Sequence, residues 1–245
     1  MQIREFYTIT ENVPAARDVF RMRLVGNTSA FSRPGQFLNI AIDGLFLRRP
    51  ISICDYDEKS VLIFYKVVGE GTRRMSAMLP GAQLDVLTGL GNGFDVASSG
   101  ACPVVVGGGV GAPPLYRLTR ELVRAGKSPA VILGFNTAAD IFLVPELESL
   151  GVPVTVATAD GSAGRRGFVT DVLPDAGAYD YVFTCGPEPM LRALYYATKT
   201  SGQYSFEARM GCGFGACMGC SCKTKYGYKR ICRDGPVLFK EEIVW

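Results

Sequence analysis

The sequence predicts an antiparallel β-barrel, then a doubly wound parallel α/β sheet, then a short cysteine-rich segment, in that order along 245 residues. Residues 1–98 hold short Val-, Ile- and Phe-rich runs between turn signals, which is typical of a small barrel. From Pro103 apolar strands alternate with amphipathic helices, the pattern of β-α-β units. A glycine-rich stretch that carries several cysteines follows. We therefore expect domains at residues 1–98, 99–205 and 206–245.

The barrel strands predicted most clearly lie at residues 36–42, 46–54 and 61–68, and turns such as Pro80-Gly81 separate them. One helix interrupts the strands. We expect a glycine turn at Gly69–Gly71 to feed this helix, which runs to about Leu79 with Thr72 as its N-cap and with two arginines in its first turn, Arg73 and Arg74. Cationic side chains there oppose the helix dipole, so they predict an anion nearby.

The second domain should place two glycine-containing loops at the carboxyl ends of parallel strands, where ligands bind such sheets. The expected strands are residues 103–106, 130–135, 152–157 and 181–184, with helices after the first strand and near residues 140–150 and 188–199. Glycines let backbone approach a pyrophosphate. The candidate residues are Gly107, Gly108, Gly109 and Gly111 in the first loop, and Cys185, Gly186 and Pro187 in the second. The acidic ribose ligand of an ordinary Rossmann fingerprint is absent near Asn136, and Cys185 is alternatively a small buried apolar residue.

The last segment carries Cys212, Cys217 and Cys220, spaced by four residues and then two, with Cys232 as a distant fourth thiol. This is the plant-type [2Fe–2S] spacing. Structural zinc is the alternative, although it usually takes two short-spaced cysteine pairs. Cys222 could replace one ligand, but Cys232 is separately placed to close the site. A disulfide framework would require an oxidising compartment.

Composition excludes several classes of function. The chain has no histidine, which removes Rieske ligation, His-bound zinc and every Ser/His or Cys/His nucleophile. A net charge of +3 without a basic block argues against nucleic acid, and no apolar run has the length of a membrane span. The N-terminus has no apolar signal region. We expect a cytoplasmic protein.

The run Arg49-Pro50-Ile51-Ser52, read with Gly71-Thr72 and the loop Thr88–Phe94, resembles the flavin-binding barrel of the ferredoxin–NADP reductase superfamily. The resemblance implies FAD, with its pyrophosphate on Arg49, Ser52 near the flavin N5, and phosphate held at Gly71 and Thr72. It also implies that the two loops of the second domain flank a nicotinamide beside Ser52 and Cys185. Further FAD-lining positions are Pro50 and Ile51, and the backbone of Phe64, Tyr65 and Lys66. Taken alone, Arg49 would be a solvated strand arginine beside an edge proline, and the two glycine elements favour the flavin site.

The whole order of motifs, ending in Cys232-Arg233-Asp234-Gly235-Pro236-Val237, resembles the electron-transfer subunit family of NAD-dependent dihydroorotate dehydrogenase. That family implies FAD, a [2Fe–2S] cluster and NAD, and a partner subunit that bears FMN, in a heterotetramer of two copies of each. The role implied is electron transfer in pyrimidine (UMP) biosynthesis. The alternatives are the flavin subunit of an NAD(P)H–ferredoxin oxidoreductase, another cluster-bearing flavin reductase, or a non-enzymatic, zinc-stapled nucleotide-binding module.

Two finer expectations concern partners of the protein. The expected adenosine side, Asn136–Asp140, has no Arg or Lys for a 2′-phosphate, so we predict NADH, although Ser162, Arg165 and Arg166 could reach such a phosphate. The cluster should face outward. The basic residues of its insertion should contact the partner subunit or else form a solvated loop; they are Lys223, Lys225, Lys229 and Arg230.

Overall fold

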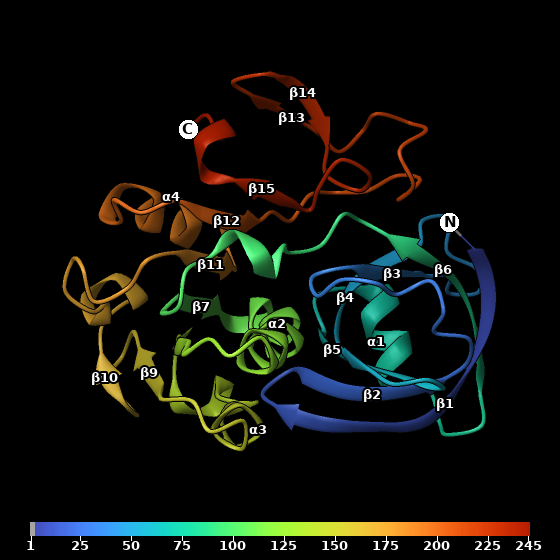
Figure 1. Ribbon diagram of the computed structural model, residues 1–245. Coiled ribbons are helices and arrows are strands. Elements are labelled where there is room, and N and C mark those ends of the chain that lie inside the picture. The colour runs from blue at the N-terminus through green and yellow to red at the C-terminus, as the bar shows by residue number, and fades with distance from the viewer. Residues whose placement is uncertain (1–2) are drawn as a thin grey trace.

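The computed structural model describes residues 3–245 and consists of a closed barrel, a mixed sheet beside it and a C-terminal segment that lies over both (Figure 1). This arrangement confirms the predicted fold class. The barrel strands follow the order β1-β2-β5-β4-β3-β6, and every neighbouring pair is antiparallel. Their bounds are β1 Ile3–Ala16, β2 Val19–Val25, β3 Phe37–Ile40, β4 Arg49–Tyr56, β5 Ser60–Lys66 and β6 Gln83–Leu90.

Alternate residues of these strands fill the barrel. Leu38 and Ile40 of β3 and Ile63 of β5 are fully buried in one apolar cluster. Helix α1, Glu70–Ser76, packs against this core through Met75, and the Asn12 amide on β1 donates 2.9 Å hydrogen bonds to the carbonyl oxygens of Met75 and Met78. The helix is thereby held to the barrel by both apolar and polar contacts.

The expected start of α1 was wrong by one turn. Gly69 is the N-cap, and Thr72 is the third residue of the helix, where its hydroxyl accepts hydrogen bonds from Val68 N (2.9 Å) and Gly69 N (3.2 Å). Arg73 and Arg74 both pair with Glu70, with N···O separations of 2.7 Å. The Glu70 carboxylate lies in the first turn and supplies the anion that these two arginines require. The arginines therefore give no reason to expect a further anion there.

The second domain is a seven-stranded sheet in the order β10-β9-β8-β7-β11-β12-β15, parallel except for the last strand. Helix α2, Pro113–Arg124, buries Leu115, Leu118 and Leu122 against it. Helix α3 is shorter than expected, because Leu143 takes a left-handed conformation (φ 68°) just before it. No helix between residues 3 and 245 is long and apolar enough to cross a membrane. The remaining bounds are β7 Val104–Gly108, β8 Ala130–Phe135, β9 Val154–Thr158, β10 Arg165–Arg166, β11 Val182–Cys185, β12 Gly202–Ser205, α3 Val144–Glu148 and α4 Glu188–Ala197, with 3₁₀ turns at Val96–Ser98, Gly109–Gly111, Ala138–Asp140, Val169–Val172 and Lys240–Glu242.

The C-terminal segment is tied into the sheet. It forms a hairpin from β13, Ser221–Thr224, and β14, Gly227–Arg230, and then β15, Val237–Phe239, pairs antiparallel with β12. Cys220, Ile231 and Cys232 share an apolar cluster with Val106 of the sheet and with Leu90 and Phe37 of the barrel. The cysteine segment therefore packs on both domains.

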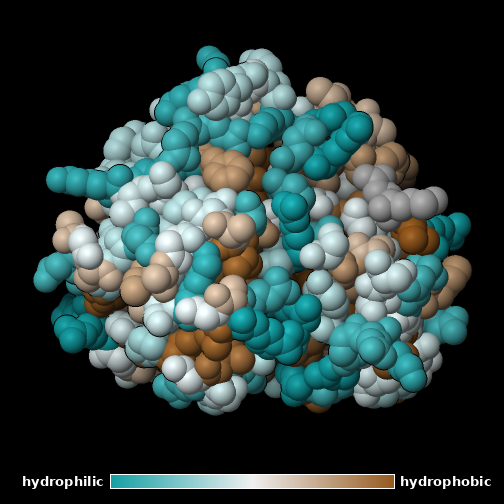
Figure 2. Space-filling model, in the orientation of Figure 1, coloured by the Kyte–Doolittle hydropathy of each residue, from teal (hydrophilic) through white to brown (hydrophobic). Residues whose placement is uncertain are grey.

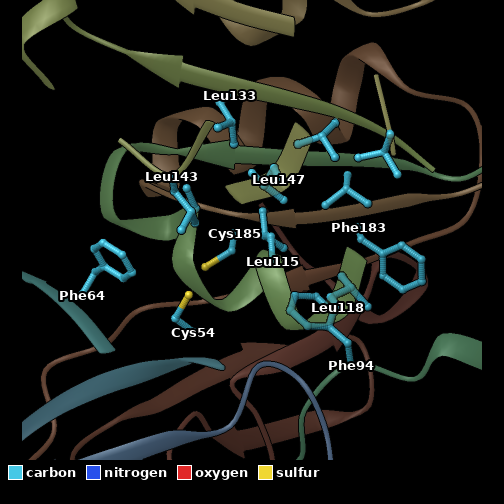
Figure 3. Packing of buried hydrophobic residues seen from close by; sticks show 14 of the residues in the cluster. Cys54, Phe64, Phe94, Leu115, Leu118, Leu133, Leu143, Leu147, Phe183 and Cys185 are labelled. Atoms are coloured by element: carbon cyan, nitrogen blue, oxygen red, sulfur yellow. The ribbon is translucent and has the colours of Figure 1, made fainter. Parts of the chain in front are cut away.

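The barrel and the sheet share a continuous apolar contact. Figure 3 shows part of it, with Cys54 and Phe64 from the barrel facing Leu143 and Cys185 from the sheet domain. Ion pairs flank this contact, where Asp55 of β4 bonds Arg117 (3.1 Å) and Arg120 (2.6 Å) of α2. These carboxylate and guanidinium groups are largely shielded from water, so breaking one partner of a pair would leave a poorly solvated charge at the domain contact.

Candidate flavin, nucleotide and iron-sulfur sites

Arg49 opens β4 and lies directly against the start of α1. A Cβ atom on Gly71 would overlap Nε of Arg49 and lie 2.6 Å from its Cζ, so glycine is needed for this approach. The structure brings Arg49, Gly71 and Thr72 together, as expected from the sequence. The Thr72 hydroxyl is taken up by Val68 and Gly69, which leaves the backbone N–H groups of the helix start and the guanidinium as the donors for a phosphate.

The four residues from Arg49 to Ser52 pair with β3, where Pro50 lies opposite Asn39 and Ser52 lies opposite Phe37. All four are half-buried. Strands β4 and β5 pair only between Ile53–Tyr56 and Val61–Ile63. Residues 49–52 of β4 and residues 64–66 of β5 are therefore not paired with each other. Within the described chain, both stretches therefore keep backbone groups that a flat ligand could contact.

The side chains of Phe64 and Tyr65 contact other protein residues. Phe64 stacks on Phe142 of the sheet domain, with ring centroids 5.3 Å apart. Tyr65 points into the barrel, stacks on Phe20, and donates a 2.8 Å hydrogen bond to Asn12 Oδ1. Burial raises the pKa of Tyr65 beyond its usual range. The backbone here and the half-buried Lys66 are therefore what remains to line a cofactor, and that role stays a prediction.

The two glycine loops of the sheet domain interlock. Cys185 pairs with Gly107 in the parallel ladder of β11 and β7. A Cβ atom on Gly111 would overlap the carbonyl oxygen of Cys185, and one on Gly108 would lie 2.5 Å from Met190 Sδ. Gly109 has φ +51° and open space around it. The two loops thus pack closely at one edge of the sheet, and Gly109 leaves open space where backbone could approach a ligand bearing a pyrophosphate.

Cys185 is 9% exposed, and burial raises the pKa of its thiol to about 12. It is therefore neutral near pH 7 and is neither a thiolate nucleophile nor a base. Its sulfur is turned toward that of Cys54, two residues beyond Ser52 on β4 (Figure 3). Cys185 thus joins the nucleotide loop to the barrel strand predicted to hold flavin.

The four predicted ligand thiols form two pairs. The backbone N–H of Cys217 donates to Cys212 Sγ, and that of Cys212 to Cys217 Sγ, at 3.4 Å each. The backbone N–H of Cys232 donates to Cys220 Sγ, also at 3.4 Å. No group of three or more thiol, carboxylate or imidazole side chains within residues 3–245 is gathered as a ready metal site. The geometry is two adjacent pairs of thiols.

The electrostatics of the pairs differ. Burial would raise the pKa of Cys212, but hydrogen bonds from the backbone N–H groups of Cys217 and Phe214 outweigh it and lower the pKa to about 6. Burial, with the neighbouring Cys220, raises the pKa of Cys232 to about 12. Iron would stabilise the thiolate of both, since a bound cation deprotonates its thiol ligands. Backbone N–H groups that donate to ligand sulfur atoms tune the reduction potential of iron–sulfur clusters. These thiols and their N–H donors therefore fit iron.

Cys222 lies on β13 opposite Lys229 and is half-buried against the apolar cluster beneath the hairpin. Burial raises the pKa of its thiol. The assignment of Cys232 rather than Cys222 as fourth ligand stays a prediction, and it is supported by the backbone bond that pairs Cys232 with Cys220.

The loop Thr88–Phe94, one of the motifs that carry the resemblance to a flavin-binding barrel, contacts the C-terminal segment. Its Asn92 bonds the C-terminal segment at Gly235 and Val237. Sequence reasoning also missed Asn39, which reaches the carbonyl oxygen of Cys212. Neither asparagine could be recognised from its neighbours in the sequence. Asn39 bonds a residue 173 positions away, and Asn92 bonds one 145 positions away.

Two of the four basic residues of the hairpin are engaged within the chain. Lys229 pairs with Glu242, and Arg230 bonds Asp234 (3.0 Å) and the carbonyl oxygen of Gly215 (2.9 Å). Arg230 therefore braces the cysteine loop. Lys223 and Lys225 are exposed.

Sequence comparisons identify relatives of this chain. Residues 207–244 match the model of the iron-sulfur cluster binding domain of dihydroorotate dehydrogenase B. The chain is 43% identical over 251 residues to the dihydroorotate dehydrogenase B (NAD(+)), electron transfer subunit, of Fusobacterium nucleatum, covering 96% of both chains. It is 39% identical over 257 residues to the subunit of the same name from a Geobacillus species, covering 100% of both.

Among solved structures, the chain is similar to the NADH-dependent reduced ferredoxin–NADP oxidoreductase studied for flavin-based electron bifurcation. The TM-score is 0.88 at 29% identity, with 98% of this chain and 90% of that chain covered. The identity over the full length of curated relatives decides the assignment. The chain belongs to the family of electron-transfer subunits of dihydroorotate dehydrogenase B (NAD(+)).

Proposed function

We propose that this chain carries electrons between NAD and the FMN of a separate dihydroorotate dehydrogenase catalytic subunit, through FAD and a [2Fe–2S] cluster, in the pathway to UMP. The packing of the four-cysteine segment on both the barrel and the nucleotide sheet is the observation that carries the proposal. One chain thereby brings three binding regions together. We further propose a heterotetramer with two copies of each subunit.

In this proposal the barrel holds FAD. Arg49 neutralises the pyrophosphate together with backbone N–H groups at Gly71 and Thr72, and the space for this exists because Gly71 has no side chain. The strand Pro50-Ile51-Ser52 and the backbone of Phe64, Tyr65 and Lys66 line the ring system. Ser52 places its hydroxyl beside the reactive edge of the flavin.

The sheet domain holds the nicotinamide cofactor. The glycine loop at residues 107–111 and the loop Cys185-Gly186-Pro187 cradle it, and the neutral, buried Cys185 keeps water from the contact with β4. When bound, FAD accepts or donates a pair of electrons at the nicotinamide and single electrons at the cluster. The protein contributes position, shielding and charge.

The cysteine segment holds the cluster. Each iron of a [2Fe–2S] centre takes two protein ligands, and the two thiol pairs supply them: Cys212 with Cys217, and Cys220 with Cys232. The N–H···S bonds withdraw electron density from the thiolates and stabilise the reduced centre.

The partner would dock beside the cluster. Tyr226 and Tyr228 of the hairpin are 78% and 74% exposed, and Lys223 and Lys225 lie next to them. Figure 2 shows that the surface at the top, over β13 and β14, is largely hydrophilic. Exposed tyrosines among basic side chains favour a polar contact with aromatic anchors.

Arg49→Ala should weaken FAD binding by about tenfold to a hundredfold, because a charged hydrogen bond contributes roughly 1.5–3 kcal/mol. Fluorescence titration of the apoprotein with FAD measures this. Arg48→Ala is the matched control. Arg48 bonds Asp85 (2.9 Å), so its loss should lower the melting temperature and leave FAD affinity within about twofold. Equal FAD affinities for the wild type and Arg49→Ala would contradict the assignment.

We expect a preference for NADH over NADPH. Asp160 follows β9 and accepts hydrogen bonds from the Ser162 hydroxyl and backbone, which lower the pKa of its carboxyl. The Ser162 hydroxyl also accepts a bond from Ala138 N, so this carboxylate lies beside the expected adenosine side of the sheet. Asp160→Asn should therefore raise kcat/KM for NADPH by about tenfold, while Asp175→Asn, which removes another exposed carboxylate of the sheet domain, should not. Steady-state kinetics with both cofactors is the measurement. A wild-type preference for NADPH would sink this expectation.

The purified chain should oxidise NADH with an artificial acceptor such as ferricyanide, yet show no conversion between dihydroorotate and orotate until an FMN-bearing subunit is added. The reason is that the barrel, the sheet and the cysteine segment use the described chain and leave no second barrel for FMN and orotate. Assaying both reactions, with and without the recombinant catalytic subunit, tests this. Dihydroorotate-dependent NAD reduction by the isolated chain would refute the division of labour.

The similarity to the NADH-dependent reduced ferredoxin–NADP oxidoreductase favours one alternative, a flavin subunit that serves ferredoxin. Anaerobic purification of the native complex, with mass spectrometry of what accompanies the chain, separates the two functions. Recovery of a ferredoxin-linked subunit without a dihydroorotate dehydrogenase would establish the alternative.

A further inference from the structure

The outer face of barrel strand β3 lies beneath the cysteine segment. Its residues alternate: Leu38 and Ile40 point into the barrel core, whereas Phe37 belongs to the apolar cluster that contains Cys220 and Cys232. Asn39 shares the outward face with Phe37. The strand that pairs with β4 therefore also supports the iron ligands.

Asn39 holds the first ligand of the segment. It is 1% exposed, and its Nδ2 donates a 3.2 Å hydrogen bond to the carbonyl oxygen of Cys212. A Cβ atom on Gly213 would overlap Nδ2 and lie 3.0 Å from Cγ of Asn39, so the loop sits directly on this amide. Its Oδ1 has no partner within residues 3–245. A leucine of the same shape would avoid a buried, unpaired acceptor, so stability alone does not explain an asparagine here.

Asn92 holds the other end of the ligand set. Its backbone N–H donates to Gly235 O (2.7 Å), its Nδ2 donates to Val237 O (2.7 Å), and Val237 N donates to its Oδ1 (3.1 Å). Gly91, with φ +80°, has no room for a side chain because a Cβ atom would lie 2.7 Å from Pro236 Cδ. These hydrogen bonds hold residues 235–237, just beyond Cys232.

We propose that Asn39 and Asn92 are positioning residues that clamp the cluster segment onto the barrel from both ends and so set the separation of the cluster from the strand Arg49–Ser52. Asn39 lies opposite Pro50 in the β3–β4 register, and Phe37 lies opposite Ser52, so one inter-strand step joins the clamp to that strand. This proposal rests on the proposed electron-transfer function. In it, the two asparagines keep the cluster at a fixed distance from the flavin.

The test uses the purified holoprotein of Asn39→Leu, Asn92→Ala and the double variant. Asn27→Leu is the matched control, because Asn27 is a barrel asparagine whose amide bonds Glu5 and Ser29, away from the segment. Anaerobic stopped-flow mixing with NADH follows flavin bleaching and then cluster reduction. The flavin phase should stay within about twofold of wild type, and cluster reduction, per bound cluster, should slow by about tenfold, because electron transfer weakens steeply as the separation of the two carriers grows and positioned groups are sensitive to small displacements.

A second readout does not depend on turnover. Hydrogen–deuterium exchange of residues 211–217 should rise in Asn39→Leu, that of residues 235–238 should rise in Asn92→Ala, and neither should rise in Asn27→Leu. Unchanged exchange together with unchanged cluster reduction would overturn the proposal. So would loss of iron with a normal rate per remaining cluster, because that result describes a structural role only. If the wild-type cluster accepts no electrons from NADH, the proposed function fails, and the exchange data still decide whether the asparagines hold the segment.

Discussion

Cys232→Ser is expected to lose most of its iron and the visible absorbance of the cluster, and to lose electron transfer to any partner. Serine offers a harder oxygen ligand with a much higher pKa than a thiol, so the iron that shares Cys220 and Cys232 would lose a thiolate. Cys232 is also 1% exposed, and its removal opens the apolar cluster around Ile231. Iron and sulfide analysis with absorbance spectra of the anaerobically purified protein measures the effect.

Cys222→Ser is the matched control, since Cys222 is a half-buried thiol in the same segment and its backbone is fixed by the β13–β14 ladder. It should keep its full complement of iron. NADH oxidation with ferricyanide should survive in both variants, because that reaction needs only the barrel and the sheet. Iron loss in Cys222→Ser with retention in Cys232→Ser would reverse the assignment of the fourth ligand.

Gly111→Ala should lower kcat/KM for NADH by about tenfold or more and also destabilise the fold. The added Cβ would overlap the carbonyl oxygen of Cys185 and lie 2.6 Å from its carbonyl carbon, and both atoms are backbone that cannot rotate away. Overpacking of this kind costs roughly 1–3 kcal/mol, and relief requires the two nucleotide loops to separate. Steady-state kinetics and thermal denaturation measure the two effects.

Gly126→Ala separates loop geometry from general destabilisation. Gly126 follows α2 with φ +75° and has open space, so alanine there costs about 1–2 kcal/mol of backbone strain without touching a loop. Its melting temperature should fall, and its KM for NADH should stay near the wild-type value. If Gly111→Ala also kept a normal KM, the close crossing of the loops would have no part in nucleotide binding.

Local patterns were sufficient wherever neighbours in the sequence decide the outcome. The strand at residues 130–135 was predicted to the residue, because a short apolar run with β-branched residues, bounded by turn signals and too short for a helix, favours a buried parallel strand. The cysteine spacing, Arg49-Pro50-Ile51-Ser52 and the two glycine loops identified the family, since each motif carries its ligand chemistry in adjacent residues. The start of α1 was misjudged because a threonine serves equally as N-cap or as third residue, and the choice depends on Gly69 and Val68 around it.

Long-range contacts required the tertiary structure. By itself the sequence determined the barrel, the sheet, the cluster motif and their order, because hydrophobic period, turns and ligand spacing are local properties. The structure decided that the loop Thr88–Phe94 grips the C-terminal segment, that Arg48 pairs with Asp85 while Arg49 lies against Gly71, and that the cysteines form two pairs. Such contacts join residues far apart along the chain, and an asparagine or arginine makes the same local pattern whichever partner the closed barrel brings to it.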